Sequence, residues 1–123
     1  MASRGSYREL VAWQRARQLA VTVYRLSERF PGAEQFALTN QARRAAISVL
    51  SNIAEGAGRG GDREFRQFLY LSRGSLAELE SQLLVASDLR YLPDDHPVFA
   101  ECAEVGRVLN GLITSLTRKM SAE

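Results

Sequence analysis

The feature that most constrains this chain is a helical spacing of apolar residues that recurs in four segments separated by glycine and proline. Apolar residues return every three or four positions, which is the repeat of an α-helix with one buried face. The segments are 7–30, 39–56, 62–91 and 97–119, and they cover about three-quarters of the chain, against a usual helical share of about one-third. No segment alternates like a strand. We therefore expect an all-α protein.

The connections between these segments are short, and this decides how the helices pack. Pro31, the glycine-rich segment 56–61 and Pro93 interrupt the helical pattern. Short connections make sequential helices antiparallel, so the sequence predicts an antiparallel up-down-up-down four-helix bundle. With 123 residues, the chain forms one domain over 1–123 with room for a single core.

The segment ends carry recognisable start signals. Ser6 and Glu9 have the spacing of a capping box, which predicts that a helix begins directly after Ser6. Thr39 and Asp62 are expected to cap the second and third helices. Pro97 suits the first turn of the fourth.

Segment 62–91 is apolar on two sides. Besides its main stripe it carries a second strip, about 120° away, made of Leu71, Val85 and Leu89. A helix that is apolar on two sides is buried on two sides, and the second partner is most simply another copy of the chain. The predicted stripes of the last three segments are Ala42, Ala45, Ala46, Val49, Ile53 and Ala57; Phe65, Phe68, Leu69, Leu76, Leu79, Leu83 and Ala86; and Val98, Cys102, Val105, Leu109, Leu112 and Leu116.

Composition excludes several functional classes. One cysteine and one histidine cannot supply a zinc site, no Glu-x-x-His pair serves a di-iron centre, and we expect neither metal nor cofactor. Cys102 fits a core position better than a nucleophile. The absence of a long apolar run or a signal-peptide core predicts no membrane partner and a cytoplasmic protein.

Charge is divided along the chain. Up to Arg73, twelve arginines face six acids, a net charge of +6, and from Gly74 onward four bases face eight acids, a net charge of −4. The glycine-rich segment 56–61 lacks P-loop spacing and is either a connector or an anion site. The arginines nearest to it in the sequence suit phosphate-backbone contact and are the nucleic-acid-binding candidates. They are Arg43, Arg44, Arg59, Arg63, Arg66 and Arg73.

One polar face of segment 39–56 is either solvated or part of a hydrogen-bonded network against another helix. It consists of Gln41, Arg44, Ser48, Ser51, Asn52 and Glu55. Ser75 and Glu78, beside the second apolar strip, are its expected partners. Buried polar groups must be paired, so such a network would fix the register of an interface.

These motifs resemble a known family. Segments 41–48 and 52–56, together with Gly74 and Ser75, look like the four-helix-bundle proteins encoded in intervening sequences of bacterial 23S rRNA genes. The resemblance implies a homo-oligomeric ring, commonly a homopentamer. It extends to the accessory variability-determinant protein of retroelements, a basic relative that works with a reverse transcriptase and nucleic acid. The matching positions are Arg44, Ser48, Asn52, Glu55, Gly56, Arg59, Gly74, Ser75 and Glu78.

The leading functional hypothesis is a non-enzymatic ring that binds RNA or DNA backbone, or a nucleoprotein, through these arginines. The alternative is a protein-interaction scaffold with no nucleic-acid role. A more remote alternative is a ribonuclease, since Arg90 and His96 resemble the Arg-x(4–6)-His signature of HEPN enzymes.

Overall fold

Four long helices and two short 3-10 turns make up the part of the chain that the computed structural model describes, residues 6–122. No strand occurs within these residues, so the predicted all-α class is confirmed. The elements are η1 (Tyr7–Glu9), α1 (Val11–Ser27), η2 (Gly32–Glu34), α2 (Leu38–Gly58), α3 (Asp62–Asp88) and α4 (Pro97–Ser121).

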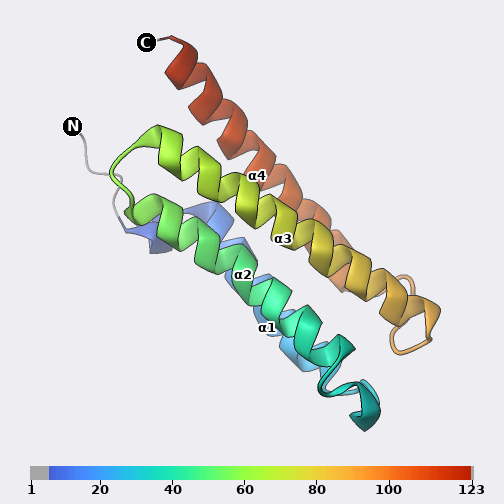
Figure 1. Cartoon of the computed structure of the whole chain (residues 1–123). Helices are drawn as coiled ribbons and strands as arrows, with labels where there is room; N and C mark the ends of the chain where they lie inside the picture. Colours follow the sequence, from blue (N-terminus) through green and yellow to red (C-terminus); the bar gives the residue numbers. More distant parts are fainter. Residues whose placement is uncertain (1–5, 123) are drawn as a thin grey trace.

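The four helices pack side by side around one apolar core (Figure 1). The α2–α3 connection lies at the same end as the C-terminal end of α4, and we call this the hairpin end (Figure 1). The α1–α2 and α3–α4 connections lie at the opposite end, where the Tyr91 hydroxyl donates to Glu34 Oε2 over 2.9 Å. α2 and α3 share the most extensive contact.

The first helix begins later than the capping box predicts. The Ser6 hydroxyl accepts from the Arg8 amide over 3.2 Å, while the Glu9 amide donates to the Ser6 carbonyl, which closes the 3-10 turn η1. Leu10 has extended backbone angles and separates this turn from α1. The predicted start directly after Ser6 is therefore wrong, since the local bonds close a tighter turn.

Two other predicted caps are wrong for a common reason: each residue lies inside the helix rather than before it. Thr39 is buried inside α2, whose N-cap is Ala37, and Asp62 is already helical, with Gly61 as N-cap. The Asp62 carboxylate still lies in the first turn, where it favours the positive end of the helix dipole. Neither α2 nor α3 has a side-chain hydrogen bond at its N-cap.

α3 ends at Asp88, three residues earlier than predicted, because the chain turns at Arg90. Arg90 has a φ of 65°, and the Tyr91 amide donates to the Ala86 carbonyl over 2.9 Å. This is a Schellman ending, whose left-handed position usually carries glycine. The turn releases the chain toward α4, where Pro97 stands in the first turn as predicted.

The buried positions follow the predicted stripes with a few exceptions. On α4, Ile113 is buried where the pattern indicated Leu112, which is only partly buried. On α3, Ser72 belongs to the buried face, whereas Phe68 is half-exposed. On α2, Ala57 is only partly buried and Gly56 is buried instead. The other predicted positions of the last three helices lie in the core.

The helix α2 approaches α3 closely at Gly56. A Cβ atom added there would lie 2.6 Å from the Phe68 Cβ and 3.3 Å from the Phe65 carbonyl oxygen. Only glycine fits between helices this close, as the small residues of α2 predict. Among residues 6–122, no helix combines the length and apolar character needed to cross a membrane.

Candidate functional site

The polar face of α2 meets α3 through a small cluster of short side chains. The hydroxyls of Ser48 and Ser75 lie 2.8 Å apart, and Asn52 Nδ2 donates to the Ser48 carbonyl at 2.9 Å and to its hydroxyl at 3.1 Å. All three side chains are half-buried. This confirms Ser75 as a partner of the polar face, and we call Ser48, Asn52 and Ser75 the polar cluster.

A further hydroxyl ties the same two helices within the core. Ser72 is fully buried, and its Oγ donates to the Val49 carbonyl over 2.7 Å. Together with Gly56 opposite Phe68, these contacts pair residues in opposite order along α2 and α3. The relative register of the two helices is therefore fixed by small side chains at several levels.

The remaining motif residues lie around the polar cluster but outside it. Arg44, Ser51 and Glu55 are exposed on α2, and Glu78 is exposed on α3, where it accepts from Gln82 Nε2 over 3.2 Å. The predicted Glu78 partnership with α2 is not observed. Gly74 is exposed in the middle of α3 with no atom near its Cβ position.

Beside this cluster, α3 leaves its second apolar strip uncovered by the rest of the chain. Leu71, Val85 and Leu89 are 56%, 49% and 50% exposed. These apolar side chains share one face of α3 with Ser75 of the polar cluster and with exposed Glu78.

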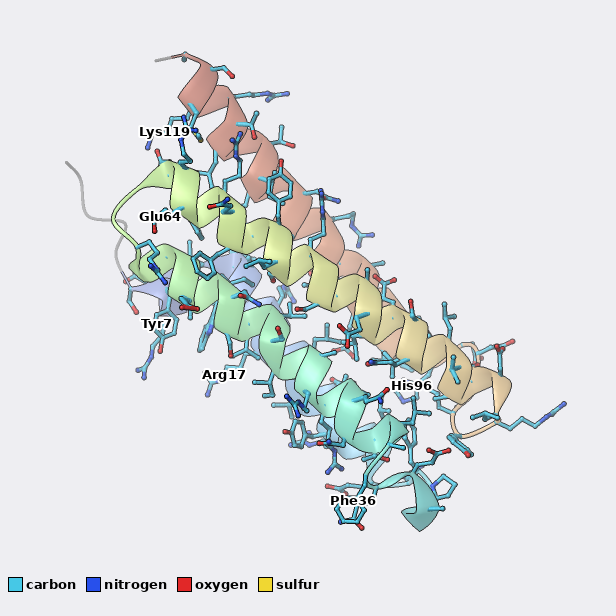
Figure 2. All side chains as sticks on the ribbon, in the orientation of Figure 1. Tyr7, Arg17, Phe36, Glu64, His96 and Lys119 are labelled. Atoms are coloured by element: carbon cyan, nitrogen blue, oxygen red, sulfur yellow. The ribbon has the colours of Figure 1, made fainter. Side chains whose placement is uncertain are left out.

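At the hairpin end, the arginine of the glycine-rich connection is held by carboxylates. Arg59 pairs with Glu55 at 3.3 Å and with Glu64 at 3.7 Å, and its guanidinium lies 5.1 Å from the centre of the Phe68 ring. Lys119 of α4 pairs with Asp62 at 2.9 Å, and Figure 2 shows Lys119 and Glu64 at this end. The basic groups here are interleaved with acids.

Two more of the predicted arginines bridge α3 to α4. Arg66 donates to the Thr117 hydroxyl at 3.1 Å, and Arg73 donates to Asn110 Oδ1 at 3.1 Å while its guanidinium lies over the Tyr70 ring. The hydroxyl and the amide oxygen are neutral partners, so both guanidinium charges remain without a carboxylate in these contacts.

The six candidate arginines do not form one patch. Arg43 and Arg44 lie near the start of α2, about 24 Å along the helix from Arg59. Arg43 packs on the Tyr24 ring and donates to the Ser27 hydroxyl over 2.8 Å, so it joins α2 to α1. Arg63 lies in the first turn of α3 and is exposed. Sequence proximity around the glycine-rich segment hides this separation.

The residues with potentially reactive side chains, Cys102 and His96, both have structural roles. Cys102 is completely buried on α4, and burial raises the pKa of its thiol to about 12, so the thiol is protonated at neutral pH. His96 accepts from the Val98 amide at Nδ1 over 3.0 Å and caps α4. Arg90 and His96 line different surface depressions.

We also searched the described residues for a cluster of metal-ligating side chains. Within residues 6–122 there is no group of three or more His, Cys, Asp or Glu side chains that could hold a metal ion.

The sequence-based prediction missed one basic surface. The outward side of α1 carries Arg17 and Arg25, and together with Arg8 of η1 they line a shallow groove of about 640 Å³. The available signal was the absence of any Asp or Glu between Leu10 and Ser27. The sequence analysis placed the nucleic-acid-binding arginines around the glycine-rich segment instead.

Taken together, the polar cluster, the apolar strip beside it and the close α2–α3 contact define a small all-helical protein with a distinctive α2–α3 face. The sequence profile of the family described as 23S rRNA-intervening sequence protein matches residues 8–111. Because the match spans most of the chain, the protein belongs to this family, which confirms the resemblance stated above. No curated protein matches the chain.

Proposed function

We propose that this protein is a non-enzymatic antiparallel bundle that assembles as a homo-oligomeric ring and binds the backbone of RNA or DNA through arginines. The observation that carries the proposal is the uncovered apolar strip of Leu71, Val85 and Leu89. Exposed apolar side chains that share one helix face are a typical mark of a protein–protein contact. A ring repeats each arginine surface once per copy, so weak phosphate contacts combine into tight binding.

The polar cluster supports assembly through the same face. It borders the apolar strip on α3, and hydrogen-bonded side chains at the edge of an apolar contact restrict how a second copy can dock. The pentamer remains the expected ring size because the family resemblance implies it.

The single cysteine is compatible with work in a reducing compartment, and we place the protein in the cytoplasm.

The charge distribution supports the nucleic-acid part. Arg44 and Arg63 are exposed, and their side chains have no ion pair with another described residue. Arg66 and Arg73 contact only neutral side chains in their hydrogen bonds. These guanidinium groups can exchange neutral or water partners for phosphate oxygens, with which they form two parallel hydrogen bonds.

Light scattering after size-exclusion chromatography tests the assembly. The wild-type protein is expected at a multiple of its 13.7 kDa chain mass, and Leu71→Glu is expected to elute as a monomer with unchanged helical circular dichroism. Val11→Glu is the matched control, because Val11 is 54% exposed on α1 and lies off the strip. A monomeric wild-type protein at micromolar concentration contradicts the proposal.

A protein-interaction scaffold without a nucleic-acid role is the second candidate, and the hydrogen-bonded polar cluster favours it. If that face serves only assembly, Asn52→Ala weakens the ring and the protein fails to shift single-stranded RNA, structured RNA and duplex DNA in gels at low salt. An intact ring that binds nucleic acid less tightly after Asn52→Ala assigns the face to ligand binding instead.

A further inference from the structure

The outward side of α1 carries a groove whose lining includes three arginines and no carboxylate. We infer that the groove along α1 binds nucleic-acid phosphate groups, and that Arg17 and Arg25 are its main contacts. This inference rests on the proposed function and names where the nucleic acid binds. It shifts the contact away from the glycine-rich connection, to which the sequence pointed.

Charge is the first support. The groove of about 640 Å³ is lined by Arg8, Arg17 and Arg25 together with Trp13, two glutamines, a valine and a threonine, and by no carboxylate. The helix itself, Val11–Ser27, contains three arginines and no Asp or Glu. A polyanion placed in the groove therefore meets three guanidinium groups and no lining carboxylate.

The nearby carboxylates of α4 are already engaged at the edge of the groove. Glu104 pairs with Arg15 at 3.1 Å, and Glu101 accepts from the Thr22 hydroxyl over 2.9 Å. Arg15 thus neutralises one carboxylate, and these bonds hold both side chains along the α1–α4 contact. The guanidinium groups of Arg17 and Arg25 have no ion pair with other described residues.

Geometry is the second support. Arg17 lies with its guanidinium carbon 5.4 Å from the centre of the Trp13 ring, and Figure 2 shows Arg17 at the outer edge of the bundle. Stacking on an aromatic ring orients the guanidinium plane and leaves its N–H edge available for a phosphate. The ring therefore prepares the donor and reduces the entropy lost on binding.

The spacing of the arginines fits a nucleic-acid strand. Arg17 and Arg25 are separated by about 12 Å along the helix axis, which corresponds to three or four steps of about 3.4 Å along the axis of a duplex. A second depression of about 330 Å³ shares Thr22 and Arg25 with the groove and adds Arg29. The row of positive groups therefore continues toward the far end of α1.

The same lining predicts binding without base recognition. Trp13 is 8% exposed, too little for a base to stack on its face. With no exposed aromatic ring in the groove, contacts fall on phosphates, which position a strand but carry little sequence information. We expect similar affinity for oligonucleotides of different sequence.

Fluorescence anisotropy with a labelled oligouridine longer than about 16 nucleotides tests the inference. The double variant Arg17→Gln/Arg25→Gln is compared with Arg59→Gln/Arg63→Gln, which removes the same charge at the hairpin end. Salt is varied between about 50 and 200 mM. The α1 double variant is expected to lower the slope of log K against log salt by at least about 1.4, or about 0.7 for each phosphate that the protein no longer neutralises. The hairpin-end variant is expected to lower the slope by at most about 0.7, because Arg63 is exposed while Arg59 already pairs with Glu55 and Glu64.

Each other outcome has a distinct meaning. If the wild-type protein fails to bind at about 50 mM salt, the proposed function fails and the inference fails with it. If only the hairpin-end variant loses binding, or both variants lose it equally, nucleic-acid binding stands and the α1 site is wrong. If the α1 variant binds as wild type but changes its mass in light scattering, the α1 site is also wrong, and the groove contributes to assembly instead. Circular dichroism must show both variants folded.

Discussion

The two helix pairs α2–α3 and α1–α4 are held together in different ways. Between α2 and α3, a glycine and buried or half-buried hydroxyls bring the backbones close. Between α1 and α4, long side chains reach across the surface, as in the pair of Arg15 and Glu104, which are 47% and 42% exposed. Close packing tolerates little change, whereas exposed charged contacts adapt. We infer that the close contact between α2 and α3 fixes the architecture of the bundle. The outer face of α1 takes little part in this contact and can therefore carry charged side chains.

The largest effect is expected at Gly56. Gly56→Ala places a Cβ 2.6 Å from the Phe68 Cβ, so the helices must separate, and we expect a loss of about 1–3 kcal/mol in the free energy of unfolding. Urea unfolding followed by circular dichroism, at one fixed protein concentration, measures it.

Gly74→Ala is the matched control for Gly56→Ala. Gly74 is also helical but has open space at its Cβ position, so alanine should stabilise the chain by about 0.5–1 kcal/mol. Equal effects at the two glycines would contradict the special closeness of α2 and α3. If Gly74→Ala instead lowers the oligomer mass, a second copy packs over the outer face of α3.

The next effect concerns the buried hydroxyl of Ser72. Ser72→Ala removes its 2.7 Å bond to the Val49 carbonyl, and we expect a loss of about 1 kcal/mol in unfolding free energy. Ser81→Ala is the control, since exposed Ser81 bonds only to Ala77 of its own helix. The control should be neutral or slightly stabilising, and a neutral Ser72→Ala would show that the hydroxyl does not hold the two helices together.

At the α1–α4 contact the expected effect is smaller. Arg15→Gln breaks the pair with Glu104, but both side chains are nearly half exposed, so we expect a loss of about 0.5 kcal/mol or less. The difference from wild type should shrink further in about 1 M salt, which screens exposed charges. A loss as large as that of Gly56→Ala would remove the distinction between the two helix pairs.

The smallest effect is expected at the hydrogen bond between Tyr91 and Glu34, which joins the α1–α2 and α3–α4 connections at the end of the bundle opposite the hairpin end. Its hydrogen bond to Glu34, with burial and the Glu34 charge, raises the pKa of Tyr91 above its usual 10.0. The protonated phenol is therefore favoured in the folded chain. Its contribution to stability is complete below pH 10 and is lost as the pH rises through the higher folded pKa.

Tyr91→Phe removes this contribution while keeping the ring that packs on Phe30. The urea midpoints of wild type and variant should differ more at pH 8 than at a pH above the raised folded pKa of Tyr91, where the wild-type phenol ionises. A constant difference across this range would mean that the hydrogen bond to Glu34 adds nothing to stability.

Several features of the site could be predicted from the sequence because they follow from local spacing. The pairing of Ser48 with Ser75 is one of them, since each residue stands on the side of its helix that faces the other. The distribution of the arginines could not be predicted in this way. Arg43 and Arg59 belong to the same stretch of sequence, yet α2 places them about 24 Å apart along its axis. The partners of Arg59 and Arg66 depend on side chains from other turns and other helices.

By itself, the sequence determined four helices, their approximate limits and most of their buried faces, because apolar spacing at a period of 3.6 acts within each segment. It also determined the apolar strip of α3. Only the structure decided the 3-10 turn at Tyr7–Glu9, the Schellman ending at Arg90 and the pairing of Lys119 with Asp62 across α4 and α3. It alone revealed the acid-free groove on α1. These features arise from competing backbone bonds and from contacts between helices, which a period along the chain does not encode.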